Sequence, residues 1–171
     1  MLKNIANFNN TNDYLPLFNA VLITDLFVIL LLNLKVIKSK VLRQWYSQYN
    51  LSAVIADVLV ILIVLIIARA IYYYIFDTFS ILNFIILAVM LQISHDVLFY
   101  YFFSIIPRGV NKMLDTFKDY AKDVSFYAIL ADSGMMIMSS LIAYYLVNKS
   151  TNTNIIVLIS FIYLLPYLLY N

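Results

Sequence analysis

Long apolar stretches separated by short polar connections are the main pattern along this chain. A bilayer core about 30 Å thick is crossed by about 20 residues of α-helix. Five stretches are long and apolar enough, at residues 14–34, 51–71, 79–106, 124–147 and 154–170. The last is the shortest and carries Pro166 near its end, so a count of four spans stays open. The pattern predicts an all-α membrane bundle that forms a single transmembrane domain over residues 1–171.

The segment 110–123 has a different pattern. Its apolar side chains recur at helical spacing on one face, and its charges alternate in sign. Pro107 and Gly109 separate it from the third span. We expect an amphipathic helix that lies on the membrane surface, or one that continues directly into the fourth span. The mixed charge favours a generic interfacial helix over a polybasic lipid-binding one.

Composition strengthens the membrane assignment. Hydrophobic residues make up 64% of the chain and charged residues 12%, whereas soluble domains average about 45–50% and about 25%. A chain of 171 residues cannot bury that much apolar surface in a soluble core. The net charge of +2 is too small to indicate nucleic-acid binding.

Several kinds of chemistry have no motif in this sequence. The chain has no cysteine, which excludes thiolate metal sites and thiol nucleophiles. It also lacks a phosphate-binding P-loop, a GxSxG nucleophile motif and a potassium-channel filter. We therefore expect neither an enzyme nor a bound cofactor.

The basic residues predict an orientation. Eight of the eleven Lys and Arg residues lie in the connections 35–50 and 107–123, and such loops face the cytoplasm. The N-terminus then lies outside or in a lumen. Arg69 is expected to reach the outer interface or to pair with Asp77. The aromatic residues expected to anchor the two membrane surfaces are Trp45, Tyr46 and Tyr49 inside, and Tyr72, Tyr73 and Tyr74 outside.

Four aspartates interrupt the apolar spans: Asp25, Asp57, Asp96 and Asp132. A charged carboxylate at a helix centre costs about 2.5–3.5 kcal/mol, so we expect these side chains to face the bundle interior, a water-filled cavity or a partner. With the predicted orientation all four lie in the inner half of the membrane, one per helix. His95 adjoins Asp96. The sequence predicts that these groups converge on one zone.

Two interpretations of the acids stay open. They form a proton or cation site, with His95 as a ligand or relay, or they hydrogen-bond across helices and hold the bundle together. Oxygen and imidazole ligands suit Mg²⁺, Mn²⁺ or Zn²⁺, but no metal-ligand spacing is present, so the metal is unknown. The predicted hydrogen-bond partners are Thr24, Asn83, Ser94, Ser133, Ser139 and Ser140.

Residues 93–143 carry the motifs "HD", "PRG.N", "FKDYAKD" and "ADS.MM". This stretch, about a third of the chain, resembles uncharacterised multi-pass membrane proteins of large nucleocytoplasmic DNA viruses. The resemblance implies a host-cell or virion membrane. It assigns no functional residue.

Two functions follow as expectations. The first is a structural or membrane-organising protein, viral in origin, whose buried acids hold the helices together. The alternative is a small proton or cation channel or transporter that uses the Asp and His cluster. The expected partners are the lipid bilayer and either further copies of the chain or other membrane or capsid proteins, but not nucleic acid.

Overall fold

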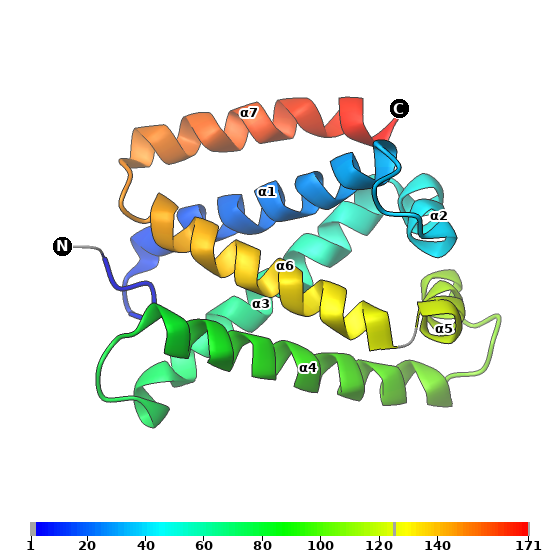
Figure 1. The fold of residues 1–171 in the computed structure, drawn as a ribbon, viewed down its shortest axis with the longest axis horizontal. Coiled ribbons are helices and arrows are strands. Elements are labelled where there is room, and N and C mark those ends of the chain that lie inside the picture. The colour runs from blue at the N-terminus through cyan, green and yellow to red at the C-terminus, as the bar shows by residue number, and fades with distance from the viewer. Residues whose placement is uncertain (1–2, 125, 171) are drawn as a thin grey trace.

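The computed structural model describes residues 3–124 and 126–170, and these residues contain helices without any strand. A short 3-10 helix η1 (Thr11–Asp13) precedes the first long helix. The α-helices are α1 (Tyr14–Asn33), α2 (Lys40–Tyr49), α3 (Leu51–Ile75), α4 (Ile81–Ile105), α5 (Lys112–Val124), α6 (Phe126–Leu146) and α7 (Thr151–Leu169) (Figure 1). The all-α prediction is confirmed.

Five helices are long and apolar enough to cross a bilayer: α1, α3, α4, α6 and α7. The chain is therefore an integral membrane protein, and the count of five spans is favoured over four. The observed helices match the predicted spans to within a few residues, although α3 continues to Ile75 and α7 begins at Thr151. Ser125, in the predicted fourth span, lies outside the described residues.

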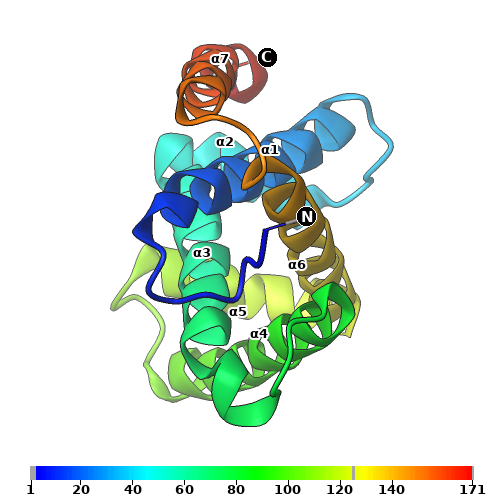
Figure 2. The same ribbon diagram turned by 90° about the vertical axis from the view of Figure 1, so that its left-hand side faces the viewer.

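Four of the long helices form a closed ring, in which α1 packs on α3, α3 on α4, α4 on α6, and α6 on α1. Figure 2 views this helix ring from the end where the N-terminus lies. Each of these helices has at least one completely buried alanine: Ala20, Ala53, Ala68, Ala88 and Ala143. Small side chains let the backbones approach closely, which is how helices associate in lipid.

Helix α7 lies outside the helix ring and packs on α1 (Figure 2). Two asparagines of α1 bind it. The Asn19 amide donates to the Asn154 carbonyl at 2.8 Å, and the Asn33 amide donates to the Leu168 carbonyl at 2.8 Å. Pro166 lies in the last turn and cannot donate to the carbonyl four residues before it, yet the helix continues to Leu169.

Two short helices, α2 and α5, cover one end of the helix ring, which we call the capped end (Figure 1). Helix α5 packs on α2, α4 and α6, and α2 packs on α3. The surface helix predicted at 110–123 corresponds to α5. Helix α2 was not predicted, although Ser39 provides its N-cap by accepting a hydrogen bond from the Leu42 amide at 3.1 Å.

The N-terminal segment, residues 3–10, crosses the opposite end of the helix ring, which we call the N-terminal end (Figure 2). Ile5 and Ala6 are completely buried there. The Lys3 backbone amide donates to the Asn148 side chain at 2.9 Å. The segment therefore closes this end of the helix ring with its own apolar side chains.

Arg69 binds the N-terminal segment from inside the helix ring. Its side chain is buried, and it donates to the carbonyls of Asn7 and of Asn10, the latter at 2.9 Å. It also forms an ion pair with Asp13 at 3.3 Å. The predicted pairing with Asp77, or extension to the interface, is wrong, because this fold brings a carboxylate and two carbonyls to the guanidinium within the protein.

Candidate functional site

The four predicted acids lie one on each helix of the ring, and none lies on α7. Asp25 is on α1, Asp57 on α3, Asp96 on α4 and Asp132 on α6. Each lies in the half of its helix that is nearer the capped end. Asp25 is completely buried and the other three are partly buried. Tyrosines of the two capping helices indicate which acids lie close together.

Tyr46 of α2 lies next to two of these acids. Burial, followed by the negative charges of Asp57 and Asp25, raises the pKa of the Tyr46 phenol well above its ordinary value. Its hydroxyl donates to Asp25 Oδ1 at 2.7 Å. The acids of α1 and α3 therefore meet beneath α2.

Tyr120 of α5 lies close to the other acids. Burial, followed by the charges of Asp132, Asp57 and Asp96, raises the pKa of the Tyr120 phenol. Asp57 acts on the tyrosines of both capping helices. Because electrostatic interactions weaken with distance, Asp57 lies near both tyrosines, Asp25 lies near Tyr46, and Asp96 and Asp132 lie near Tyr120. We call these four acids the acid cluster.

Asp25 and Asp57 attach α2 to the helix ring. Tyr46 binds Asp25, and the Trp45 indole N–H donates to Asp57 Oδ2 at 2.9 Å. Both aromatic side chains are 5% exposed. From the sequence these residues were expected to anchor the chain in the membrane surface, whereas in the structure their polar groups bind the acids.

Asp96 and Asp132 make no hydrogen bond to another helix among the described residues. Asp96 Oδ1 accepts from the Gln92 amide at 2.7 Å and lies 3.2 Å from His95 Nδ1, both on its own helix. Its Oδ2 is buried without a hydrogen-bond partner. Asp132 lies on the neighbouring helix α6, which packs against α4. Unlike Asp25 and Asp57, these two acids therefore do not join their helices to other helices by hydrogen bonds among the described residues.

The hydroxyl and amide partners predicted for the acids are wrong within the described residues. Thr24, Ser94 and Ser133 instead donate to the carbonyl four residues earlier in their own helices, a local bond that a helical hydroxyl forms readily. Ser139 donates to Thr24 at 3.0 Å, which joins α6 to α1. Neither Asn83 nor Ser140 bonds an acid.

His95 does not complete a metal site. Its side chain is 37% exposed and its imidazole stacks on Phe99, with 5.7 Å between the two centroids. Residues 3–124 and 126–170 contain no group of three His, Cys, Asp or Glu side chains close enough to hold a metal ion. The arrangement of these acids and His95 therefore suits hydrogen bonding and proton binding better than a metal cation, which needs several ligands at once.

Of the other predicted aromatic anchors, some form hydrogen bonds within the protein and two are exposed on its surface. The Tyr49 hydroxyl donates to the Lys112 carbonyl at 2.8 Å, which joins α2 to α5. Tyr72 is completely buried, and its hydroxyl accepts from the Ser80 amide at 2.8 Å. The exposed aromatic residues near that end of α3 are Tyr73 and Tyr74.

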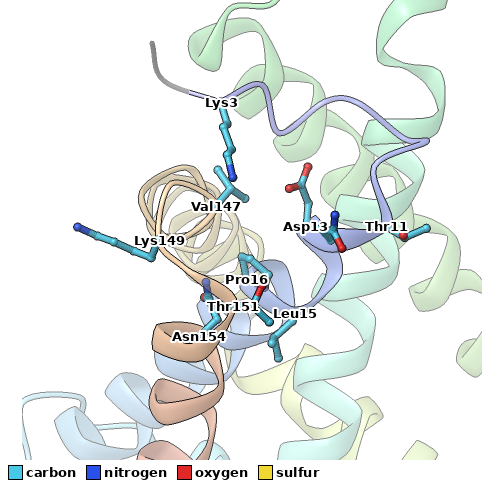
Figure 3. A pocket seen from close by; sticks show the side chains of 10 residues that line it. Lys3, Thr11, Asp13, Leu15, Pro16, Val147, Lys149, Thr151 and Asn154 are labelled. Atoms are coloured by element: carbon cyan, nitrogen blue, oxygen red, sulfur yellow. The ribbon is translucent and has the colours of Figure 1, made fainter.

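A pocket of about 230 Å³ opens at the N-terminal end, away from the acid cluster. Figure 3 shows Lys3 reaching towards Val147, while Lys149 points away from the pocket. Asp13 also lines it, but this carboxylate already pairs with Arg69. The pocket therefore offers no unused acid, and the candidate site remains the cluster at the capped end.

No protein-family model, curated protein or solved structure matches this chain. The geometry described above is therefore the basis for functional assignment.

Proposed function

We propose that this integral membrane protein handles protons, and that Asp96 and Asp132 take up and release them at the capped end. The supporting observation is that these acids lie on adjacent helices without an interhelical hydrogen bond and without a Lys or Arg partner among the described residues. An intramembrane carboxylate in that position is expensive while charged, and a proton removes the charge. Acids of this kind occur in proton relays of pumps and transporters.

Tyr120 and His95 extend the proposed proton site. The Tyr120 phenol lies within electrostatic range of Asp132 and Asp96, and His95 is adjacent to Asp96. A hydroxyl and an imidazole can both give and accept a proton. In the present conformation the N-terminal segment closes the other end of the helix ring, so net transport requires this segment to move.

Proton flux tests the proposal directly. The protein is reconstituted in liposomes that contain a pH-sensitive dye, and a pH gradient is imposed in each direction. We expect Asp96→Asn and Asp132→Asn each to slow the flux by about a hundredfold, which is the lower end of what a positioned proton-transfer group contributes. Asp77→Asn is the matched control, because Asp77 is exposed in the connection after α3. A wild-type protein without flux in either direction overturns the proposal.

A structural, membrane-organising role is the second candidate, and the two bonds that attach α2 favour it. Under this role Asp25→Asn and Asp57→Asn are tolerated, because an amide oxygen still accepts the bonds. Asp25→Leu and Asp57→Leu remove the acceptor and disrupt assembly. Size-exclusion chromatography in detergent separates these outcomes, and normal assembly of both Leu variants contradicts the structural role.

Orientation and location complete the proposal. The excess of Lys and Arg in the connections that lead to α2 and α5 supports a cytoplasmic capped end and an external or lumenal N-terminal end. The resemblance of residues 93–143 to viral membrane proteins supports a host-cell or virion membrane. Further copies of the chain, or other membrane or capsid proteins, are the partners that we propose.

A further inference from the structure

A basic pocket is lined by the C-terminal end of α4, the connection after it and the surface helix α5. Figure 1 shows how these two helices lie at the capped end. The volume of the pocket is about 230 Å³. Three cations, two hydroxyl-bearing residues and one buried aromatic ring line it: Arg108, Lys118, Lys122, Tyr100, Ser104 and Phe103. No carboxylate belongs to its described lining. Segment 110–123 alone has mixed charge, but folding brings Arg108 to the same pocket as two of its lysines.

Neighbouring carboxylates hold two of these cations in place. Arg108 donates to Asp119 Oδ1 at 2.6 Å, and this bond lowers the pKa of Asp119. Lys118 donates to the Ile106 carbonyl and lies 3.8 Å from Asp115. A guanidinium has five N–H donors and an ammonium has three, so both cations keep donors for a ligand.

The charge count limits the ligand. Among the described side chains, three cations line the pocket and two carboxylates pair with them, which leaves one net positive charge. A phosphodiester carries one negative charge and presents acceptor oxygens to several N–H donors at once. A phosphomonoester or polyphosphate carries more negative charge than this pocket neutralises.

The position of the pocket favours a lipid as the source of that phosphodiester. It lies where a membrane-spanning helix ends and an amphipathic helix begins, which is the level of phospholipid headgroups. Ile105 and Tyr101, the next residues in sequence after the lining residues Ser104 and Tyr100, are exposed on α4. Basic pockets at this level bind anionic lipid headgroups.

We propose that this pocket binds the phosphodiester of an anionic glycerophospholipid, whose acyl chains lie along the exposed surface of α4. Arg108 and Lys122 provide most of the N–H donors that are left for the phosphate oxygens, and Lys118 of α5 provides the others. The lipid then joins α4 to α5. The proposal is independent of proton handling by the acid cluster.

Native mass spectrometry of the full-length protein in detergent tests the lipid site. We expect wild type to retain phosphatidylglycerol in preference to phosphatidylcholine. Lys122→Gln should weaken phosphatidylglycerol binding about fivefold, and the double variant Arg108→Gln/Lys122→Gln about 25-fold, since each cation near the membrane surface contributes about 1 kcal/mol. The matched control is Lys35→Gln/Lys38→Gln, which removes two exposed cations from the other basic connection.

Three results overturn the proposal. The first is equal retention of the two lipids by wild type. The second is an equal loss of phosphatidylglycerol in the pocket variants and in the control, which shows a general effect of charge. The third is binding of inorganic phosphate without a preference for phosphatidylglycerol, which assigns the pocket to a soluble anion. Lys122→Gln alone keeps the test valid if Arg108→Gln disturbs the folding of α5, because the Lys122 side chain is exposed.

Discussion

A carboxylate inside an apolar helix needs a hydrogen-bond donor, a cation or a proton, and the four acids of this chain differ in which of these they have. Asp25 and Asp57 have aromatic donors from α2. Asp96 has only donors from its own helix, and Asp132 has no hydrogen bond among the described residues. Among the described residues, the same residue type in similar sequence surroundings therefore binds a neighbouring helix at two positions and does not at the two others.

Alkaline pH should release α2 by ionising Tyr46. Burial and the charges of Asp57 and Asp25 raise the pKa of this phenol in the folded protein. Its contribution to stability is therefore complete below about pH 10, the ordinary tyrosine value, and is lost as pH rises through the raised pKa. Trp45 is the only tryptophan in the chain, so a red shift of its fluorescence as pH rises above about 10 measures the release.

Two variants check the origin of this transition. Tyr46→Phe removes the donor to buried Asp25, which should lower the free energy of unfolding by about 1–3 kcal/mol. Its Trp45 emission should already be red-shifted at neutral pH, without the later alkaline transition. Tyr74→Phe is the control, because the Tyr74 side chain is 89% exposed. An alkaline transition that is unchanged in Tyr46→Phe would show that another group causes it.

At the scale of elements, the two ends of the helix ring are closed by different means. Helix α2 has 10 residues, which is too short to be stable alone in water, and its stability comes from contacts with α3, α5 and the acids. The N-terminal segment forms only the one-turn helix η1, and Arg69 holds it through backbone carbonyls and Asp13. Each closure combines buried apolar side chains with a few polar bonds.

Arg69→Gln should free the N-terminal segment. The substitution leaves Asp13 buried without its cation, and breaking a buried ion pair in this way costs about 3–5 kcal/mol. We expect a lower melting temperature in detergent and faster hydrogen exchange at residues 3–10. Lys149→Gln removes an exposed cation at the same end and should change neither measurement. Unchanged exchange in Arg69→Gln would mean that apolar packing alone holds the segment.

At the scale of the whole molecule, five spans place the capped end and the N-terminal end on opposite sides of the bilayer. The helix ring uses four of the long helices, and α7 adds a fifth that ends at the side of the molecule where α2 lies (Figure 1). Two asparagines bind α7 to α1. These interhelical hydrogen bonds explain how a helix with few buried apolar side chains stays attached in lipid.

The sidedness of the chain can be measured by labelling single introduced cysteines, because the chain has no cysteine of its own. We expect a membrane-impermeant maleimide to modify Asn9→Cys and Thr78→Cys from one side of sealed vesicles. Lys38→Cys, Lys112→Cys and Tyr170→Cys should react only from the other side. All five positions are exposed. Labelling of Tyr170→Cys from the Asn9 side would reduce the number of spans to four.

Local properties of the sequence determined the membrane class, the positions of the spans, the surface helix α5 and the four intramembrane acids, because apolar length, helical period and residue type require no knowledge of packing. They also indicated that the acids turn away from lipid, since exposure of a charge to acyl chains is expensive. Helix α2 was detectable in principle from Ser39 and from the spacing of Val41, Trp45 and Tyr49.

The partners of the acids were decided only by tertiary structure. Tyr46 and Asp25 are 21 residues apart on different helices, and they meet only because α2 folds back over the helix ring. The same holds for Arg69 and Asp13, 56 residues apart. A carboxylate in a helix can accept a hydrogen bond from any donor that packing brings next to it. The positions of residues along the sequence therefore do not identify which donor will be its partner.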